Sequence, residues 1–193
     1  PPSVSPTALP ASFRLRRTVA VSRAPWAMGS VKNRRVHVLG KGGLADAVRE
    51  HLTRKGASLD GTADAVIDLA GSVYDSFTLA QCLESDRPRD WLCATQVGVV
   101  PTDSEASALA GARAGFAKAI GREWDETFAR VVDVGTEMSD ADAAAVICQE
   151  LAAPDGTVEI FWRGQERSAI ELEVLPIPDK GAALQGEPVV VLT

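Results

Sequence analysis

The stretch VHVLGKGGLADAVREHLTRKG, residues 36–56, decides the fold class of this chain. It opens with a short apolar run at 36–39 and passes through the glycine-rich turn 40–43. Leu44, Val48 and Leu52 then recur at helical spacing until Gly56. Apolar residues at this spacing indicate a helix, and a glycine just past the last of them marks its end. The stretch therefore predicts a buried strand, a tight turn and an amphipathic helix.

The same alternation continues along the chain. Apolar or alternating runs predict strands at 13–21, 65–69, 91–100, 129–134, 157–162 and 167–174, with a very weak one at 57–59. Helical spacing predicts helices at 72–84, 104–124 and 139–151. Short strands that alternate with helices are typical of α/β proteins with a parallel sheet. We expect a truncated Rossmann-like three-layer sandwich with a mostly parallel sheet, in which right-handed crossovers place helices on both faces.

Composition narrows the class of protein. The chain has 193 residues, of which 46% are hydrophobic and 24% charged, as expected for a globular chain of one domain or slightly more. No apolar run approaches the ~20 residues of a membrane span, and no signal peptide is evident, so we expect a cytoplasmic protein. The first residue is Pro1, which suggests a fragment or an excised domain. Three widely spaced cysteines and two histidines predict reduced thiols and no metal site.

Charge is distributed unevenly along the sequence. The net charge is -6, yet residues 1–35 carry seven basic side chains and no acidic one. The acidic remainder argues against a nucleic-acid-binding protein. Four arginines of the basic arm are candidate contacts for an acidic partner: Arg14, Arg16, Arg34 and Arg35. The alternative is a solvated strand and linker.

The turn after the first strand of the repeat matches a dinucleotide fingerprint, G-x-G-x-x-A. Its glycines allow a tight turn and close approach of a pyrophosphate to the helix. An acid ~20 residues further on should hold the ribose. The candidate cofactor-binding residues are therefore Gly40, Gly42, Gly43 and Asp60, with Asp64 as a second acid. The ribose-binding acid should follow a well-formed strand, however, and the segment before Asp60, residues 57–59, has only a very weak strand pattern. We favour a glycine-rich turn without a ligand over a working cofactor site.

No catalytic residue can be assigned from the sequence. Short-chain reductases use a Tyr with a Lys four residues later, which lowers the pKa of the phenol. The only tyrosine is Tyr74, and residue 78 is a threonine. A G-x-S-x-G hydrolase motif is also missing from the sequence.

The helix at 104–124 carries glycines one turn apart, Gly111 and Gly115. Each glycine costs a helix ~1 kcal/mol, so their presence suggests a close neighbour. Either the sheet of this chain or a partner domain satisfies that requirement.

Five segments together resemble a known family. They read GGLADAVREHLTRKGA, GARAGFAKAIGREW, ARVVDV, DAAAVICQEL and EIFWRGQERSAIEL. Their order and spacing resemble the N-terminal half of the ketoreductase of type I polyketide synthases, especially the iterative and polyunsaturated-fatty-acid-synthase types. The resemblance covers residues 12–193.

The resemblance implies a division of labour. In that family the first half is a structural, non-catalytic subdomain that binds no cofactor. It braces a second half, which binds NADPH and reduces carrier-bound β-ketoacyl groups. For this chain it implies a linker at 1–12, the Rossmann-like structural subdomain at 13–175, a linker at 176–188, and at 189–193 the first strand of an absent catalytic subdomain. The expected partners are that catalytic subdomain and an acyl carrier protein. The alternatives are a small dinucleotide-binding protein and a carrier-docking module.

Overall fold

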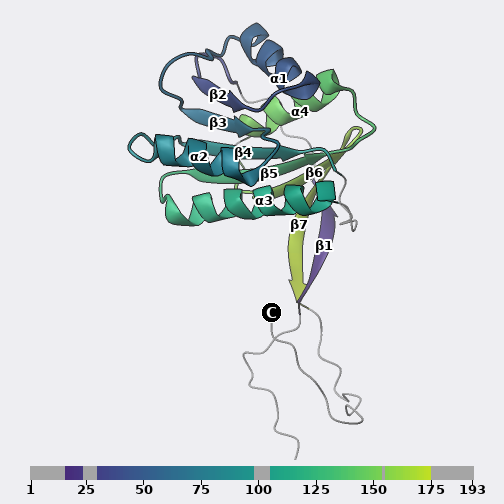
Figure 1. The fold of residues 1–193 in the computed structure, drawn as a ribbon. Coiled ribbons are helices and arrows are strands. Elements are labelled where there is room, and N and C mark those ends of the chain that lie inside the picture. The colour runs from purple at the N-terminus through teal and green to yellow at the C-terminus, as the bar shows by residue number, and fades with distance from the viewer. Residues whose placement is uncertain (1–15, 24–29, 98–104, 154, 175–193) are drawn as a thin grey trace, which may run out of the picture. The chain divides into compact units, whose positions relative to one another are not determined.

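The computed structural model describes residues 16–23, 30–97, 105–153 and 155–174 (Figure 1). The chain divides into two units. One consists of Val21–Ile170, and the other joins Pro1–Ala20 with Glu171–Thr193. The expected linkers at 1–12 and 176–188 and the strand at 189–193 lie outside the described residues.

Seven strands form one sheet, in the order β1-β7-β6-β5-β4-β3-β2. Adjacent strands from β2 to β6 are parallel, and β6 pairs with β7 in antiparallel fashion. The strands are β1 (Arg16–Ser22), β2 (Val36–Leu39), β3 (Ala65–Asp68), β4 (Asp90–Thr95), β5 (Phe128–Val134), β6 (Glu159–Arg163) and β7 (Glu166–Val174). The mostly parallel α/β sheet expected from the sequence is confirmed.

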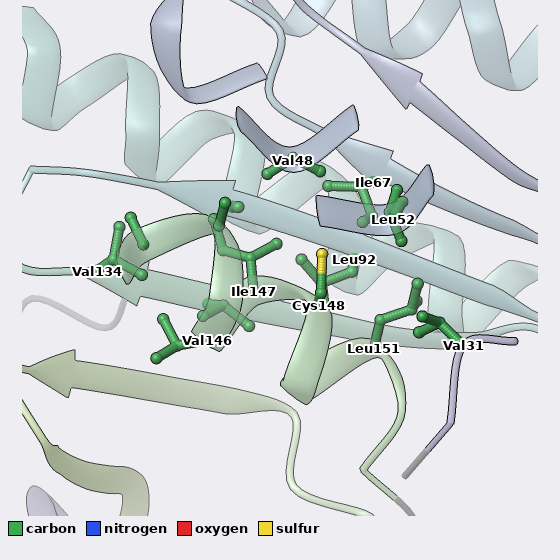
Figure 2. Close-up of a cluster of buried hydrophobic side chains, with 14 of the residues drawn as sticks. Val31, Val48, Leu52, Ile67, Leu92, Val134, Val146, Ile147, Cys148 and Leu151 are labelled. Atoms are coloured by element: carbon green, nitrogen blue, oxygen red, sulfur yellow. The ribbon is translucent and has the colours of Figure 1, made fainter. Parts of the chain in front are cut away.

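Within the described segments, four helices cover the two faces of the sheet. They are α1 (Gly43–Arg54), α2 (Val73–Leu83), α3 (Glu105–Glu123) and α4 (Asp140–Leu151). Side chains of α1 and α4, such as Val48 and Ile147, pack against one face, as Figure 2 shows. Side chains of α2 and α3, such as Ala80 and Ile120, pack against the other face around Trp91. The three-layer sandwich is therefore confirmed.

The crossovers do not all have the same hand. From β2 to β6 the strands follow one another across the sheet in chain order. When the direction of travel is constant, moving a connecting helix to the other face reverses the hand of the crossover. The β5–α4–β6 connection therefore has the opposite hand to β3–α2–β4 and β4–α3–β5. Uniformly right-handed crossovers, which are the general rule, are not what this chain has.

Two helices begin with a serine cap. Ser72 accepts a hydrogen bond from the backbone of Asp75, and Ser139 accepts one from Asp142. In both helices an acid in the first turn also faces the positive end of the helix dipole. None of the helices in the described segments is long and apolar enough for a membrane span.

A buried group of charges joins β5, α4 and β7, and we call it the charge cluster. The carboxylate of Glu150 accepts hydrogen bonds from Arg130 at 3.1 Å, from Arg167 at 2.6 and 3.0 Å, and from the indole of Trp162 at 2.9 Å. Asp155 pairs with both arginines, at 2.6 and 2.9 Å. Because Glu150 is only 2% exposed, its charge depends on these partners rather than on water.

Candidate functional site

The turn between β2 and α1 has most of the geometry of a dinucleotide loop. Gly40 has φ +121°, and a Cβ there would lie 2.5 Å from the carbonyl oxygen of Leu69. Gly42 has φ +97° with open space around its Cβ position. Ala45 is 1% exposed, against the sheet. A tight turn, an accessible backbone and close helix packing are the three roles that the fingerprint assigns to these positions.

The start of α1 nevertheless faces an acid. The carboxylate of Asp140, at the first residue of α4, occupies the place where a Cβ on Gly43 would lie. A side chain at position 43 would require the exposed carboxylate of Asp140 to move aside. A pyrophosphate entering here would meet a like charge, and the helix terminus already has an anion beside it.

The two candidate ribose acids lie at the wrong end of the sheet. Asp64 pairs with Arg35 at 2.6 Å, directly before β2 begins, whereas Gly40 follows the end of that strand. This pair lowers the pKa of Asp64 to about 2. Asp60 donates its backbone N–H to Ser58, which forms an isolated bridge to Arg35. The structure therefore does not bring either acid to the glycine turn.

The weak strand expected at 57–59 is reduced to that single bridge. At the carboxyl half of β2, the guanidinium of Arg49 donates to the carbonyl oxygens of Val38 at 3.0 Å and of Gly40 at 2.6 Å. A further strand would take these hydrogen bonds in a full sheet. Arg49 therefore closes the edge at which the acid-bearing strand would have to stand.

A cavity of about 810 Å³ lies beside the turn, between the ends of β2 and β3 and helix α2. We call it the crevice. Tyr74, which is 75% exposed, is one of its lining residues. The lining residues are Val38, Leu39, Gly40, Lys41, Leu69, Ala70, Gly71, Tyr74, Asp75, Thr78, Leu79 and Cys82.

A buried arginine side chain from α3 bridges the carboxyl ends of the neighbouring strands β3 and β4. Arg113 of α3 donates to the carbonyl oxygens of Asp68 at 2.7 Å and of Ala94 at 3.1 Å. The neighbouring thiol, Cys93, is buried, and burial raises its pKa to about 12. A thiol in this state is not a nucleophile near neutral pH.

Neither a catalytic base nor a metal site emerges from the described part of the chain. His37 is exposed on the edge strand β2 rather than buried, and His51 lies on α1. Partial burial, followed by the nearby charge of Arg54, lowers the pKa of the His51 imidazole. The described residues hold no group of three metal-ligating side chains.

The candidate interface arginines have partners inside the chain. Arg34 pairs with Asp90 and donates to the carbonyl oxygen of Leu151 at 3.1 Å. Arg35 pairs with Asp64. Arg14 and the side chain of Arg16 lie outside the described part of the chain.

The outer surface of the α2 and α3 layer combines two exposed glycines of α3 with exposed apolar side chains from both helices. Gly111 and Gly115 are exposed, with no atom within 4 Å of the Cβ that each would carry. Tyr74 is 75% exposed, Phe77 46% and Leu109 40%. We call these five residues the α2–α3 face. Sequence reasoning found the glycines but not the aromatic side chains on α2, because nothing in its spacing shows which apolar residues stay uncovered.

No family model matches the sequence, and no curated protein matches it. Solved structures, however, share the fold. An A1-type ketoreductase is 19% identical with a TM-score of 0.63, over 86% of this chain and 44% of that chain. A-type ketoreductases from a modular polyketide synthase give 17% identity and a TM-score of 0.65, over 89% and 44%. The first ketoreductase of the tylosin polyketide synthase gives 17% and 0.62, over 83% and 41%.

These likenesses establish the fold. The chain has the architecture found within polyketide synthase ketoreductase domains, and it spans less than half the length of each of the three.

Proposed function

We propose that this chain is the non-catalytic structural half of a polyketide or fatty-acid synthase ketoreductase. It braces a separate half that uses NADPH to reduce carrier-bound β-ketoacyl groups. The observation that carries the proposal is the match of 83–89% of this chain to less than half of each of three ketoreductase chains. The resemblance of the sequence segments to the N-terminal half of that family supports the same assignment.

The glycine turn fits a scaffold better than a cofactor site. Its backbone has the right shape, but Asp140 faces the helix terminus and Arg49 closes the strand edge. The phosphate and the ribose of a dinucleotide would both lack their usual partners.

The α2–α3 face supports a bracing role. Glycine costs a helix ~1 kcal/mol relative to alanine, and no described atom lies close to Gly111 or Gly115 to offset that cost. Exposed aromatic side chains beside a smooth helix suit the close approach of helices from another domain. We therefore place the contact with the reductase half on this face.

A titration of the isolated chain with NADPH tests the absence of a cofactor site. We expect no saturable change in tryptophan fluorescence up to millimolar NADPH. The alternative is a dinucleotide-binding protein, which the geometry of Gly40, Gly42 and Ala45 favours. It predicts that NADPH binds at micromolar concentration and that Gly42→Val abolishes this binding. That result would overturn the scaffold proposal.

Leucine substitutions test the bracing face. In the polypeptide that joins this chain to the reductase half, we expect Gly111→Leu and Gly115→Leu to lower ketoreduction of a β-ketoacyl thioester severalfold. The isolated variants should not lose stability, because leucine favours the helix and the Cβ positions are open. Ala141→Leu, at an exposed position of α4, is the matched control. Unchanged activity in both glycine variants would remove the face from the proposal.

An acyl carrier protein remains a further proposed partner through the basic arm. Such docking would weaken as salt is added, since exposed charges are screened within ~8 Å at physiological ionic strength. Because Arg34 and Arg35 pair with Asp90 and Asp64, a charge reversal there also breaks contacts inside the chain. The test is a salt titration of carrier binding by the unmodified chain, and salt-independent binding would exclude the arm.

A further inference from the structure

The crevice lies where open α/β sheets hold their ligands. It is lined by the loops that follow β2 and β3, two adjacent parallel strands. The helices that follow these strands leave to opposite faces, since α1 packs with the first core cluster and α2 with the second. Ligands of open α/β sheets bind outside the carboxyl ends of the strands.

The walls of the crevice are mainly apolar. Leu39 of β2, Leu69 after β3 and Leu79 of α2 line it from three sides. Its volume of about 810 Å³ falls within the range of small-molecule sites, ~300–1,000 Å³. An apolar body several carbons long fits a cavity of this size and lining.

Among the described residues, two charged side chains line the crevice, and they differ in their hydrogen-bond partners. The carboxylate of Asp75 accepts a hydrogen bond from the hydroxyl of Ser72 at 2.9 Å, at the start of α2. The ammonium of Lys41 is exposed and has no ion-pair partner in the described segments. Asp75 keeps its negative charge at the start of α2, and Lys41 is the lining cation at which an anion could find a counter-ion.

We propose that the crevice binds an amphipathic anion, with its apolar body between α2 and the ends of β2 and β3 and its anionic end at Lys41. The proposal does not require the scaffold assignment, and the two share one residue, Tyr74, which belongs to both the crevice and the α2–α3 face. It also differs from dinucleotide binding, because it uses neither the start of α1 nor a ribose-binding acid.

Cys82 gives a direct readout of this site. It lines the crevice and is exposed, whereas the two other cysteines, Cys93 and Cys148, are buried. Alkylation by iodoacetamide, followed by intact-protein mass spectrometry, therefore reports on Cys82 first. We expect octanoate, well below its micelle concentration, to slow the alkylation at least threefold in a saturable way. Octanol at the same concentration should protect less.

Matched variants locate the binding. Thr78→Trp fills the crevice from the exposed side of α2 and should abolish protection, whereas Gln81→Trp, on the same helix but outside the lining, should not. Lys41→Met should weaken octanoate binding about two- to fivefold, the value of one exposed charge pair, and Lys55→Met should leave it unchanged.

Three outcomes would overturn the inference. One is alkylation that octanoate does not affect, and another is equal protection by octanol with no effect of Lys41→Met. The third is loss of protection in Gln81→Trp as well as in Thr78→Trp. NADPH binding by the chain bears only on the scaffold proposal, so the two failures are distinguishable.

Discussion

Replacing Glu150 with glutamine should severely destabilise the fold. All four hydrogen bonds that the carboxylate accepts come from donors on Arg130, Arg167 and Trp162. A glutamine amide offers one oxygen in place of two, and its NH2 group would face another donor.

The balance of charges within the charge cluster sets the size of the expected loss in stability. Two buried arginines are matched by Glu150 and Asp155, so Glu150→Gln leaves one positive charge buried without a counter-ion. Removing one partner of a buried ion pair costs about 3–5 kcal/mol. That is a large share of the total stability of a domain, about 5–15 kcal/mol.

Urea unfolding followed by tryptophan fluorescence measures this loss, and Trp162 reports from within the charge cluster. Glu159→Gln is the matched control. Its partner Lys118 lies 2.8 Å away, but the two side chains are 27% and 41% exposed, so the control should lose less than about 1 kcal/mol. A Glu150→Gln variant within 1 kcal/mol of the unmodified chain would refute the reasoning.

Three further outcomes follow from local geometry. Asp64, held at a pKa of about 2 by Arg35, stabilises the fold above its unfolded pKa of 3.8 and loses that contribution as the pH falls toward 2. Acid unfolding of Asp64→Asn should therefore depend less on pH between about 4 and 2, and an unchanged dependence would contradict the pairing. Ellman's reagent should titrate one thiol, Cys82, in the native chain and three in urea, because burial raises the pKa of Cys93 and Cys148 to about 12. Rapid reaction of a second native thiol would argue against the packing. Gly40→Ala should lower the free energy of unfolding, measured in urea, by about 1–3 kcal/mol, since its φ is +121° and Leu69 blocks the Cβ. An unchanged free energy of unfolding would contradict this steric argument.

The regular elements were predictable because each has its own periodicity. The expected helix at 139–151 is Asp140–Leu151 in the structure, and the expected strand at 129–134 is Phe128–Val134. The segment 57–59 has only two apolar residues, Ala57 and Leu59, and it does not form a strand. The side chain of Arg49 donates the hydrogen bonds to β2 that a neighbouring strand would otherwise make. A side chain that substitutes for a strand leaves no periodic signal.

The candidate site was predictable only in part. The shape of the turn at Gly40 follows from its local sequence, and it formed as expected. The positions of Asp60 and Asp64 depend on how the chain returns after α1, which a count of residues does not give. The charge cluster joins Arg130, Glu150 and Arg167 from three elements, and their only sequence signal is a charge within an otherwise apolar segment.

The placement of α1 and α4 on the same face of the sheet affects how the chain acquires its core during synthesis. Helices α2 and α3 are neighbours in sequence and cover their face of the sheet soon after they leave the ribosome. The side chains of α1 that pack against α4, such as Val48 and Leu52, make these contacts only after α4 has been synthesised, about a hundred residues later. Such distant contacts form slowly, and surfaces left waiting for them are prone to aggregate. A nascent chain halted before residue 140 therefore leaves uncovered the part of this face on which α4 packs, and it should be a substrate for chaperones.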